Sequence, residues 1–295
     1  MSVITDVSVE SLTPTIGAEV VGLDLRQPLD AATVRFLRDA LLEHLVLFFR
    51  DQDMNIDDHL RFARYFGEID MPPFRSAGAD RPELTVLDQT KPKGQGADSW
   101  HADYTHRPEP PMGSILRAVQ LPAGGGGDTC FASMYAAYDD LSPSMRAFID
   151  TLQAENTLAM MAERARVHTP EAKLAEPGEN GYPSFVHPVV RVHPETGRRL
   201  LNVNANWTSR IIGLTDDESD AILRLLLAHV KRPDYQCRFR WSPGAVAFWD
   251  NRAVQHFAVA DYSERRVMER ITIQGDRPFG VTGRPADLLA DRPET

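Results

Sequence analysis

The chain has little that would suit a secreted or membrane-spanning protein. Only two cysteines, Cys130 and Cys237, occur among 295 residues, so the sequence offers no disulfide framework and suits a reducing compartment. The N-terminus lacks the basic and apolar segments of a signal peptide, and no apolar run is long enough to cross a membrane. We therefore expect a cytoplasmic protein with no membrane as partner.

A surplus of positive charge is also absent. The formal net charge is −10, which argues against nucleic acid as a partner. Net charge says nothing about one cavity, so a local basic pocket for a small anion stays open. With 42% hydrophobic residues, the chain can bury one large core or two modest ones. Because β-rich barrels of this length often form one unit, we expect a single domain over residues 1–295.

The hydrophobic pattern contains many short strands and fewer helices. Helical spacing and capping residues predict helices over 31–44, 56–66, 133–139, 143–153 and 216–230. Alternating or short continuous apolar runs predict two strands within 5–25 and others over 45–49, 84–87, 114–119, 189–192, 200–203, 235–241, 245–249, 255–259 and 265–274. This pattern predicts a mainly β protein with flanking helices, a β-sandwich or jelly roll with helical packing on one side.

Two polar segments are predicted to lack regular structure. Residues 160–182 have mixed charge, several helix breakers and little periodicity, so we expect a loop excursion near 158–185, of the kind that often forms a lid. The run Gly124–Gly127 has the glycines of a phosphate loop, but neither the Lys-Ser/Thr pair nor a helix start follows it. We therefore interpret the run as a tight turn.

Two distant segments together form a candidate metal site. In W-H-A-D-Y-T, His101 and Asp103 are two residues apart, so on a β-strand both side chains would leave the same face. The segment W-D-N-R-A-V-Q-H adds His256. Two histidines and one carboxylate are the ligand set of non-haem Fe(II) oxygenases, which leaves three metal positions open. The alternative is that the His101–Asp103 pair is only a structural hydrogen bond.

An arginine pair downstream of the second histidine strengthens the metal hypothesis. Arg266 and Arg270 lie four apart on a predicted strand, so both point to the same face. Arginines that face a barrel interior are costly unless each meets an anion. The planar guanidinium suits a carboxylate, phosphate or sulfonate. The alternative is an exposed sheet face on which both arginines are solvated.

Further motifs occur along the whole chain: Ile16-Gly17-Ala18-Glu19, Gly22-Leu23-Asp24-Leu25, Phe48-Phe49-Arg50-Asp51-Gln52, Phe66-Gly67-Glu68, Gly126-Gly127-Asp128-Thr129, His187-Pro188-Val189-Val190 and Trp249-Asp250-Asn251-Arg252. Together with the candidate ligands, these motifs show that the chain resembles, nearly end to end, the taurine dioxygenase / chlorophenoxyacetate dioxygenase family. The resemblance implies a double-stranded β-helix (jelly-roll) core and an oxidoreductase that uses Fe(II), 2-oxoglutarate and O2. It also implies a homo-oligomer, a dimer or a tetramer.

The resemblance assigns a role to each matching position. It implies that His101, Asp103 and His256 bind the iron and are catalytic, that Thr129 and Arg266 hold the distal carboxylate of 2-oxoglutarate, and that Arg270 binds the acidic end of the primary substrate. Because related halogenases lack the carboxylate ligand, the presence of Asp103 favours hydroxylation.

The chain departs from the taurine-cleaving members near the substrate. Those members carry a histidine shortly after the Phe-Gly-Glu motif, whereas residues 69–73 here are I-D-M-P-P, and Trp207 stands where they have a smaller aromatic residue. We therefore expect taurine to be a poor substrate. The predicted substrate is a small organic anion, a sulfonate, sulfate ester or aryloxy acid, whose hydroxylation releases the heteroatom group. The alternatives are hydroxylation or desaturation of an amino acid or natural-product intermediate, and a non-catalytic jelly-roll module that only binds.

Overall fold

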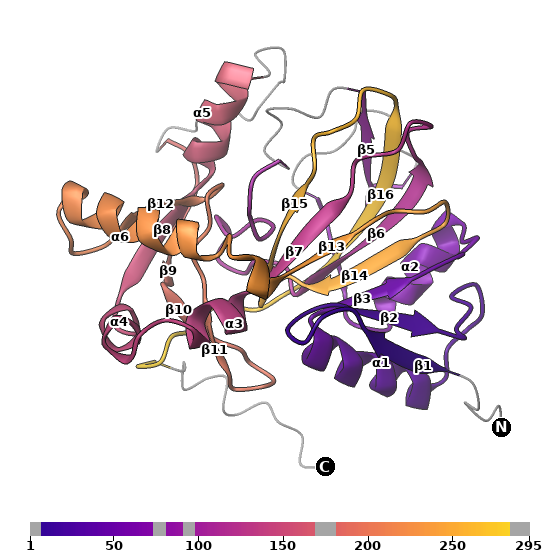
Figure 1. Cartoon of the computed structure of the whole chain (residues 1–295), viewed down its shortest axis with the longest axis horizontal. Coiled ribbons are helices and arrows are strands. Elements are labelled where there is room, and N and C mark those ends of the chain that lie inside the picture. Colours follow the sequence, from indigo (N-terminus) through magenta and orange to yellow (C-terminus); the bar gives the residue numbers. More distant parts are fainter. Residues whose placement is uncertain (1–6, 73–80, 91–97, 169–180, 284–295) are drawn as a thin grey trace.

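The computed structural model describes residues 7–72, 81–90, 98–168 and 181–283 (Figure 1). The helices of this part are α1 (Ala31–His44), α2 (Ile56–Arg64), α3 (Met134–Asp139), α4 (Pro143–Ile149), α5 (Leu158–His168) and α6 (Asp216–His229). The strands are β1 (Ser8–Ser11), β2 (Ala18–Val21), β3 (Val46–Phe49), β4 (Ile69–Asp70), β5 (Thr85–Gln89), β6 (Gly113–Gln120), β7 (Thr129–Ser133), β8 (Gln153–Thr157), β9 (Ser184–Pro188), β10 (Val190–Val192), β11 (Arg199–Leu201), β12 (Thr208–Ile211), β13 (Gln236–Phe239), β14 (Val246–Asp250), β15 (Val254–Ala258) and β16 (Arg266–Ile273).

Two sheets form the jelly-roll core. The larger has eight strands in the order β1-β2-β3-β14-β6-β16-β4, with β5 also paired to β16. The smaller has the order β13-β7-β15. Strands distant in sequence are neighbours in both sheets, because β14 lies between β3 and β6, and β7 lies between β13 and β15. The mainly β jelly-roll fold predicted from the sequence is confirmed.

The inner strands β3, β14, β6 and β16 of the large sheet bury side chains on both faces. Because successive side chains of a strand point to opposite faces, alternate residues join different cores. One face packs toward the smaller sheet and contributes Phe48, Leu116, Ala247 and Met268 to the larger hydrophobic core. The opposite face packs on α1 and α2 and contributes Leu47, Ile115, Phe248 and Ile271 to a second core. Because both faces are covered, these strands have apolar residues on each side rather than a polar face.

The helix starts follow the capping residues of the sequence. The Asp30 side chain accepts a hydrogen bond from the Thr33 N–H at the start of α1, and Thr215 and Glu218 form the predicted capping box of α6. At the other end of α1, Leu45 has φ 67 and is the left-handed C-cap. The strand predicted over 45–49 therefore begins one residue later, at Val46.

Several predicted boundaries are wrong, and long-range strand pairing is the reason. The helix predicted over 143–153 ends at Ile149, because Gln153–Thr157 forms β8, which pairs with β9 and β12. The predicted excursion near 158–185 begins with helix α5 and ends in strand β9, while 169–180 lie outside the described residues. A local pattern cannot show partners that are tens of residues away.

The helices are not confined to one side, contrary to the prediction. α1 and α2 cover the large sheet, whereas α3, α4 and α6 lie beside the small strands β8–β12 (Figure 1). None of the described helices is long and apolar enough to span a membrane.

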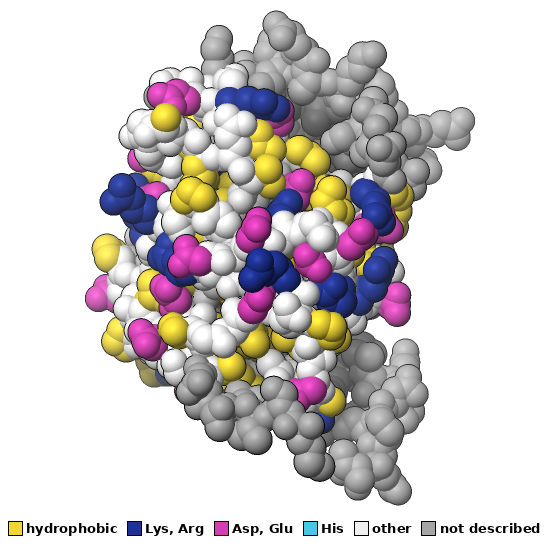
Figure 2. Space-filling view, turned by 90° about the vertical axis from the view of Figure 1, so that its right-hand side faces the viewer, with side chains coloured by type: hydrophobic (Ala, Val, Ile, Leu, Met, Phe, Trp, Pro, Cys, Tyr) yellow, Lys and Arg dark blue, Asp and Glu magenta, His cyan; other side chains and the backbone are white. Residues whose placement is uncertain are grey.

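Basic and acidic side chains alternate over the face shown in Figure 2, without gathering into a patch of one sign among the described residues. Arg81–Asp57 and Arg265–Asp88 are examples of exposed ion pairs in this protein. Surface pairs of this type contribute little to stability.

Candidate active site

Backbone pairing brings the two histidines of the candidate metal site together. His101 and His256 form an isolated antiparallel bridge in which each N–H donates to the other's carbonyl oxygen, at 3.1 and 2.8 Å. Their ring centroids are 4.3 Å apart. His256 lies on β15, which is held in place by β7 along its whole length. The position of one histidine therefore determines that of the other.

Asp103 reaches the same point from a turn. Residues 102–104 are not in a strand, so the prediction that His101 and Asp103 share one face of a β-strand is wrong. The Asn251 side chain holds this turn, because its Oδ1 accepts from the Asp103 N–H at 2.7 Å and its Nδ2 donates to the Asp103 carbonyl at 3.0 Å. Ser114 donates to the Asp103 carboxylate at 3.1 Å.

The three side chains form a buried cluster with the donor set of a divalent metal. One potential ligand atom from each of His101, Asp103 and His256 lies within 4.8 Å of the others. All three residues are buried. Two imidazoles and one carboxylate on neighbouring positions match the facial triad of non-haem iron sites. The residues that the sequence analysis singled out are thus brought together by the fold.

Protonation favours metal binding at this cluster. The Nδ1 of His101 lies 2.7 Å from the Ser99 carbonyl, which can only accept, so Nδ1 carries the proton and Nε2 keeps its lone pair. Burial lowers the pKa of His101, and burial lowers the pKa of His256 to about 3. Burial raises the pKa of Asp103, but Arg270 and the two histidines more than offset it and hold that pKa at about 2. At neutral pH the cluster is two neutral imidazoles and one carboxylate.

Arg270 contacts the acidic member of the cluster. Its Nη1 donates to Asp103 Oδ1 and its Nη2 to the Tyr104 hydroxyl, both at 2.9 Å. Its Nε is buried and has no hydrogen-bond partner among the described residues. Burial lowers the pKa of Arg270, but Asp103 and Tyr104 outweigh it and raise that pKa, so the guanidinium stays charged.

Arg266 is buried in a different environment, at the start of β16. Its Nε and Nη2 lack any hydrogen-bond partner in the described part of the chain. A Cβ at Gly127, which has φ +73, would lie 2.8 Å from the Arg266 Nε. Glycine is therefore required where the Gly124–Gly127 turn passes the guanidinium. Arg266 is 3% exposed and the Arg270 side chain 12%, which excludes the alternative of a solvated sheet face.

Thr129 lies at the start of β7, two residues after Gly127. It is buried, and its hydroxyl accepts a hydrogen bond from the Trp241 Nε1 at 3.0 Å. Among the described residues, Trp241 is the recorded hydrogen-bond partner of this hydroxyl, which leaves its proton for a further acceptor. Thr129 and Arg266 thus place a hydroxyl and a guanidinium at the same end of the barrel, where the Gly124–Gly127 turn passes.

Trp207 belongs to a small aromatic cluster beside the metal residues. It packs with Tyr104 and Leu158, and its Nε1 donates to the Ala102 carbonyl at 2.9 Å. The ring of His106 lies 4.4 Å from the Trp207 ring, centroid to centroid. Trp207 therefore presents apolar surface next to the turn that carries Asp103.

Sequence reasoning missed two residues of the site. Asn251 lies inside the W-D-N-R motif and Tyr104 inside W-H-A-D-Y-T, so the motifs themselves were the available signal. Neither role follows from residue type alone, since the contacts of Asn251 with Asp103 and of Tyr104 with Arg270 join segments far apart in sequence.

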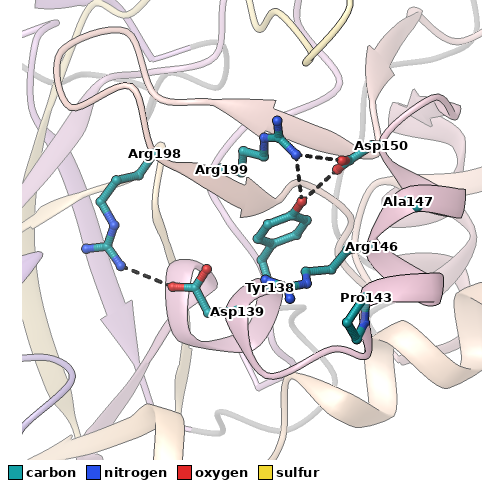
Figure 3. A pocket seen from close by; sticks show the side chains of 8 residues that line it. All are labelled: Tyr138, Asp139, Pro143, Arg146, Ala147, Asp150, Arg198 and Arg199. Carbon is teal, nitrogen blue, oxygen red and sulfur yellow. Dashed lines mark hydrogen bonds and ion pairs between the residues drawn. The ribbon is translucent and has the colours of Figure 1, made fainter.

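A separate surface hollow lies between α3, α4 and the β10–β11 hairpin (Figure 3). Its charged groups are mostly paired with one another. Arg199 and the Tyr138 hydroxyl both contact the Asp150 carboxylate at 2.8 Å, and Arg198 lies 3.4 Å from Asp139. The hollow includes none of the predicted site residues.

Two imidazoles and a carboxylate buried inside a jelly-roll barrel are the arrangement typical of non-haem iron oxygenases. A family model described as Taurine catabolism dioxygenase TauD, TfdA family, matches residues 8–272. The chain therefore belongs to the TauD/TfdA family and is an α-ketoglutarate-dependent dioxygenase, an oxidoreductase that uses Fe(II), 2-oxoglutarate and O2. The family, the enzyme class and the cofactors predicted from the sequence are confirmed.

Curated relatives and solved structures match over nearly the whole chain. An alkylsulfatase of Acinetobacter baylyi is 37% identical over 96% of this chain and 92% of its own length. An alpha-ketoglutarate-dependent sulfate ester dioxygenase of Pseudomonas putida is 38% identical over 94% of this chain and 93% of its own length. The crystal structure of a taurine dioxygenase from Burkholderia xenovorans has a TM-score of 0.80 and 37% identity, covering 94% of this chain and 92% of that one.

Proposed function

We propose that this dioxygenase hydroxylates a small alkyl sulfate ester at the carbon that bears the sulfate oxygen. The observation that carries the proposal is Arg270, a buried guanidinium that contacts the metal-site carboxylate Asp103 and still has an unused Nε donor. Two relatives at 37% and 38% identity are named for sulfate esters. An organic sulfate combines an anion for Arg270 with an alkyl chain for the apolar surface of Trp207.

The proposal gives each side chain of the site one task. His101, Asp103 and His256 would hold Fe(II), since their donor atoms converge and their protonation suits a metal. Arg266 and Thr129 would hold the distal carboxylate of 2-oxoglutarate. The Nε and Nη2 of Arg266, which have no partner among the described residues, support this role, because a buried guanidinium without an anion is costly. Arg270 would hold the sulfate group, and Trp207 would contact the alkyl chain.

Bound iron and 2-oxoglutarate would together supply, with O2, the oxidising power that replaces a substrate C–H hydrogen by a hydroxyl group. The chain's own contribution is binding and orientation. Arg270 would hold the anion beside Asp103, one of the three residues that would hold the iron, and so would orient the adjacent C–H bonds. A carbon that carries both a hydroxyl and a sulfate oxygen then collapses to an aldehyde, and the C–O bond breaks to release hydrogen sulfate.

Taurine fits this arrangement less well than an alkyl sulfate. Its ammonium group would need acceptors, whereas the cluster of Tyr104, Leu158 and Trp207 is apolar. An unpaired ammonium against such a surface is penalised, while each buried methylene contributes roughly 0.8 kcal/mol. In the segment where taurine-cleaving members have a histidine, Asp70 is instead paired with Arg107 at 2.9 Å.

The proposal is tested by steady-state assays of 2-oxoglutarate consumption with hexyl sulfate, taurine and a phenoxy acid. We expect hexyl sulfate to have the highest kcat/KM, with one sulfate released per 2-oxoglutarate consumed. A highest kcat/KM for taurine, or consumption without sulfate release, would overturn the substrate assignment. It would leave the metal assignment intact.

The metal assignment has its own test. His256→Ala should abolish turnover and weaken Fe(II) binding in a metal titration, because it removes one of three protein ligands. His44→Ala, at the end of α1, is the matched control and should bind iron as the wild type does. Near-normal turnover by His256→Ala would refute the triad.

We also propose that the protein forms a homo-oligomer in the cytoplasm and acts on no nucleic acid. The family resemblance supports the first statement, and the cysteine content and net charge support the others. Light scattering after size-exclusion chromatography distinguishes a dimer or tetramer from a monomer.

A further inference from the structure

We propose that Tyr104 is a specificity-determining residue that donates its phenolic hydrogen bond to the same acidic group of the substrate that Arg270 binds. The inference deepens the proposed function and rests on it. The ligand would be an organic oxyanion with at least two terminal oxygens, such as an alkyl sulfate.

The hydrogen bond from Arg270 leaves the proton of the Tyr104 hydroxyl free. A guanidinium has only donors, so the Tyr104 hydroxyl must accept from the Arg270 Nη2, at 2.9 Å. The hydroxyl proton therefore points elsewhere. Within the described part of the chain no side chain or carbonyl accepts this proton, and Tyr104 is 7% exposed. A buried hydroxyl proton without an acceptor is a donor that a ligand can use.

The second step is that Arg270 has a free donor beside this hydroxyl. Its Nη1 is used by Asp103, but its Nε is buried and has no partner among the described residues. Leaving a buried donor unsatisfied costs free energy. An anion with several oxygens can accept from the guanidinium and from the Tyr104 hydroxyl at once, whereas a ligand with one acceptor cannot.

Backbone conformation explains how two adjacent residues reach one guanidinium. In a strand, the side chains of Asp103 and Tyr104 would leave opposite faces. Tyr104 instead has φ 53, in the left-handed region that is unfavourable for residues other than glycine. The Arg107 N–H donates to the Tyr104 carbonyl at 3.0 Å and closes the turn. Strain of this kind is often retained at binding sites.

The surroundings of Tyr104 are polar on one side and apolar on the other. Its hydroxyl contacts the Arg270 Nη2. The other face of the ring packs in the cluster with Leu158 and Trp207. Tyr104 thus joins the polar and the apolar parts of the proposed substrate site, with its hydroxyl toward the anion and its ring toward the alkyl chain.

The test is the Tyr104→Phe variant, which removes the hydroxyl and keeps the ring. We expect KM for hexyl sulfate to rise about 10-fold or more, the effect of losing one hydrogen bond to a charged group. The affinity for 2-oxoglutarate, measured by tryptophan fluorescence, should change less than twofold. Tyr135→Phe is the matched control, because it removes a buried hydroxyl bonded to Thr196, and its KM should equal that of the wild type.

An unchanged KM in a folded Tyr104→Phe enzyme would overturn the inference. An equal loss of 2-oxoglutarate affinity and of thermal stability would also overturn it, because those changes indicate a structural role. If Tyr104→Phe does not fold, Tyr104→His and Tyr104→Leu are compared instead. Histidine tolerates positive φ and keeps an N–H donor, whereas leucine has no donor. Equal KM values in that pair would then refute the role of the donor.

The failure of the proposed function is distinguishable from these outcomes. If the wild type neither binds nor turns over hexyl sulfate, the sulfate-ester assignment is wrong. If the wild type turns over hexyl sulfate and Tyr104→Phe has the same KM, only the role of Tyr104 is wrong.

Discussion

Two regions of this protein bury arginines in opposite ways. The first region is the W-D-N-R motif, Trp249–Arg252. There, Arg252 donates from Nε and Nη2 to the two oxygens of Asp250, at 2.9 and 2.6 Å. Its Nη2 also contacts Glu195 at 2.8 Å. His193 contacts the same Asp250 carboxylate at 3.0 Å. At the metal end of the barrel, by contrast, Arg266 and Arg270 keep buried nitrogens without partners among the described residues.

The difference distinguishes an arginine that stabilises the fold from an arginine that can bind a ligand. A buried guanidinium whose acceptors come from the same chain is satisfied once the protein folds, so it needs no ligand. A buried guanidinium with unused donors is satisfied only when an anion arrives. On this reasoning Arg252 holds the turn that leads into β15 and His256, whereas Arg266 has donors available for an anion, for which 2-oxoglutarate is the proposed ligand.

The largest expected effect is on the free energy of unfolding, at the Arg252–Asp250 pair. Arg252→Ala leaves the Asp250 carboxylate buried without its main partner, which typically costs about 3–5 kcal/mol. Urea denaturation followed by circular dichroism measures the loss. The control is Arg232→Ala, which removes an exposed pair with Asp140 and should cost no more than about 1 kcal/mol. Similar losses in both variants would break the comparison.

The second expected effect is on the affinity for 2-oxoglutarate, at Arg266. Arg266→Ala should weaken 2-oxoglutarate about 30-fold, the effect of losing roughly 2 kcal/mol from an ion pair. At 100 times its Kd, a ligand stabilises the wild type by about 2.7 kcal/mol, and the variant should gain less than about 1 kcal/mol at that concentration. Thermal melts with and without 2-oxoglutarate measure both values. Full ligand stabilisation in the variant would remove Arg266 from the co-substrate site.

The smallest expected effect is a difference in acid sensitivity. Burial raises the pKa of Asp250, but Arg252 and His193 outweigh it and hold that pKa well below the ordinary 3.8. A carboxylate with a depressed pKa in the folded state contributes stability above the unfolded pKa and loses it as pH falls further. Below about pH 4 the wild type should therefore lose up to about 1.4 kcal/mol per pH unit through Asp250. The Asp250→Asn variant should show a shallower slope in unfolding titrations between pH 4 and 2, and an identical slope would contradict the pairing.

Much of the fold was predictable because local physics decides it. Helix α1 spans the predicted residues 31–44, since its cap and its apolar spacing agree. The alternation of β16 placed Met268 in one core and Ile271 in the other, and Glu269 on the second face is paired with Arg117 at 2.6 Å. Strand β8 was missed because its polar sequence, Q-A-E-N-T, becomes a strand only through its partners.

The sequence by itself determined which functional groups the candidate site contains. Two histidines, a carboxylate and two arginines were recognisable from residue type, spacing and motif, because the ligand preferences of a metal or an anion depend on functional groups. The single-domain organisation remains a prediction from length and composition alone.

Only the tertiary structure decided how these groups meet. The His101–His256 bridge, the Asn251 side chain that holds the Asp103 turn, and the two contacts of Arg270 all join segments from distant parts of the chain. The left-handed turn at Tyr104 replaced the strand that the H-x-D spacing had predicted. The physical reason is that a local pattern fixes the period of a segment, whereas long-range backbone pairing and burial fix its partners and the direction of its side chains.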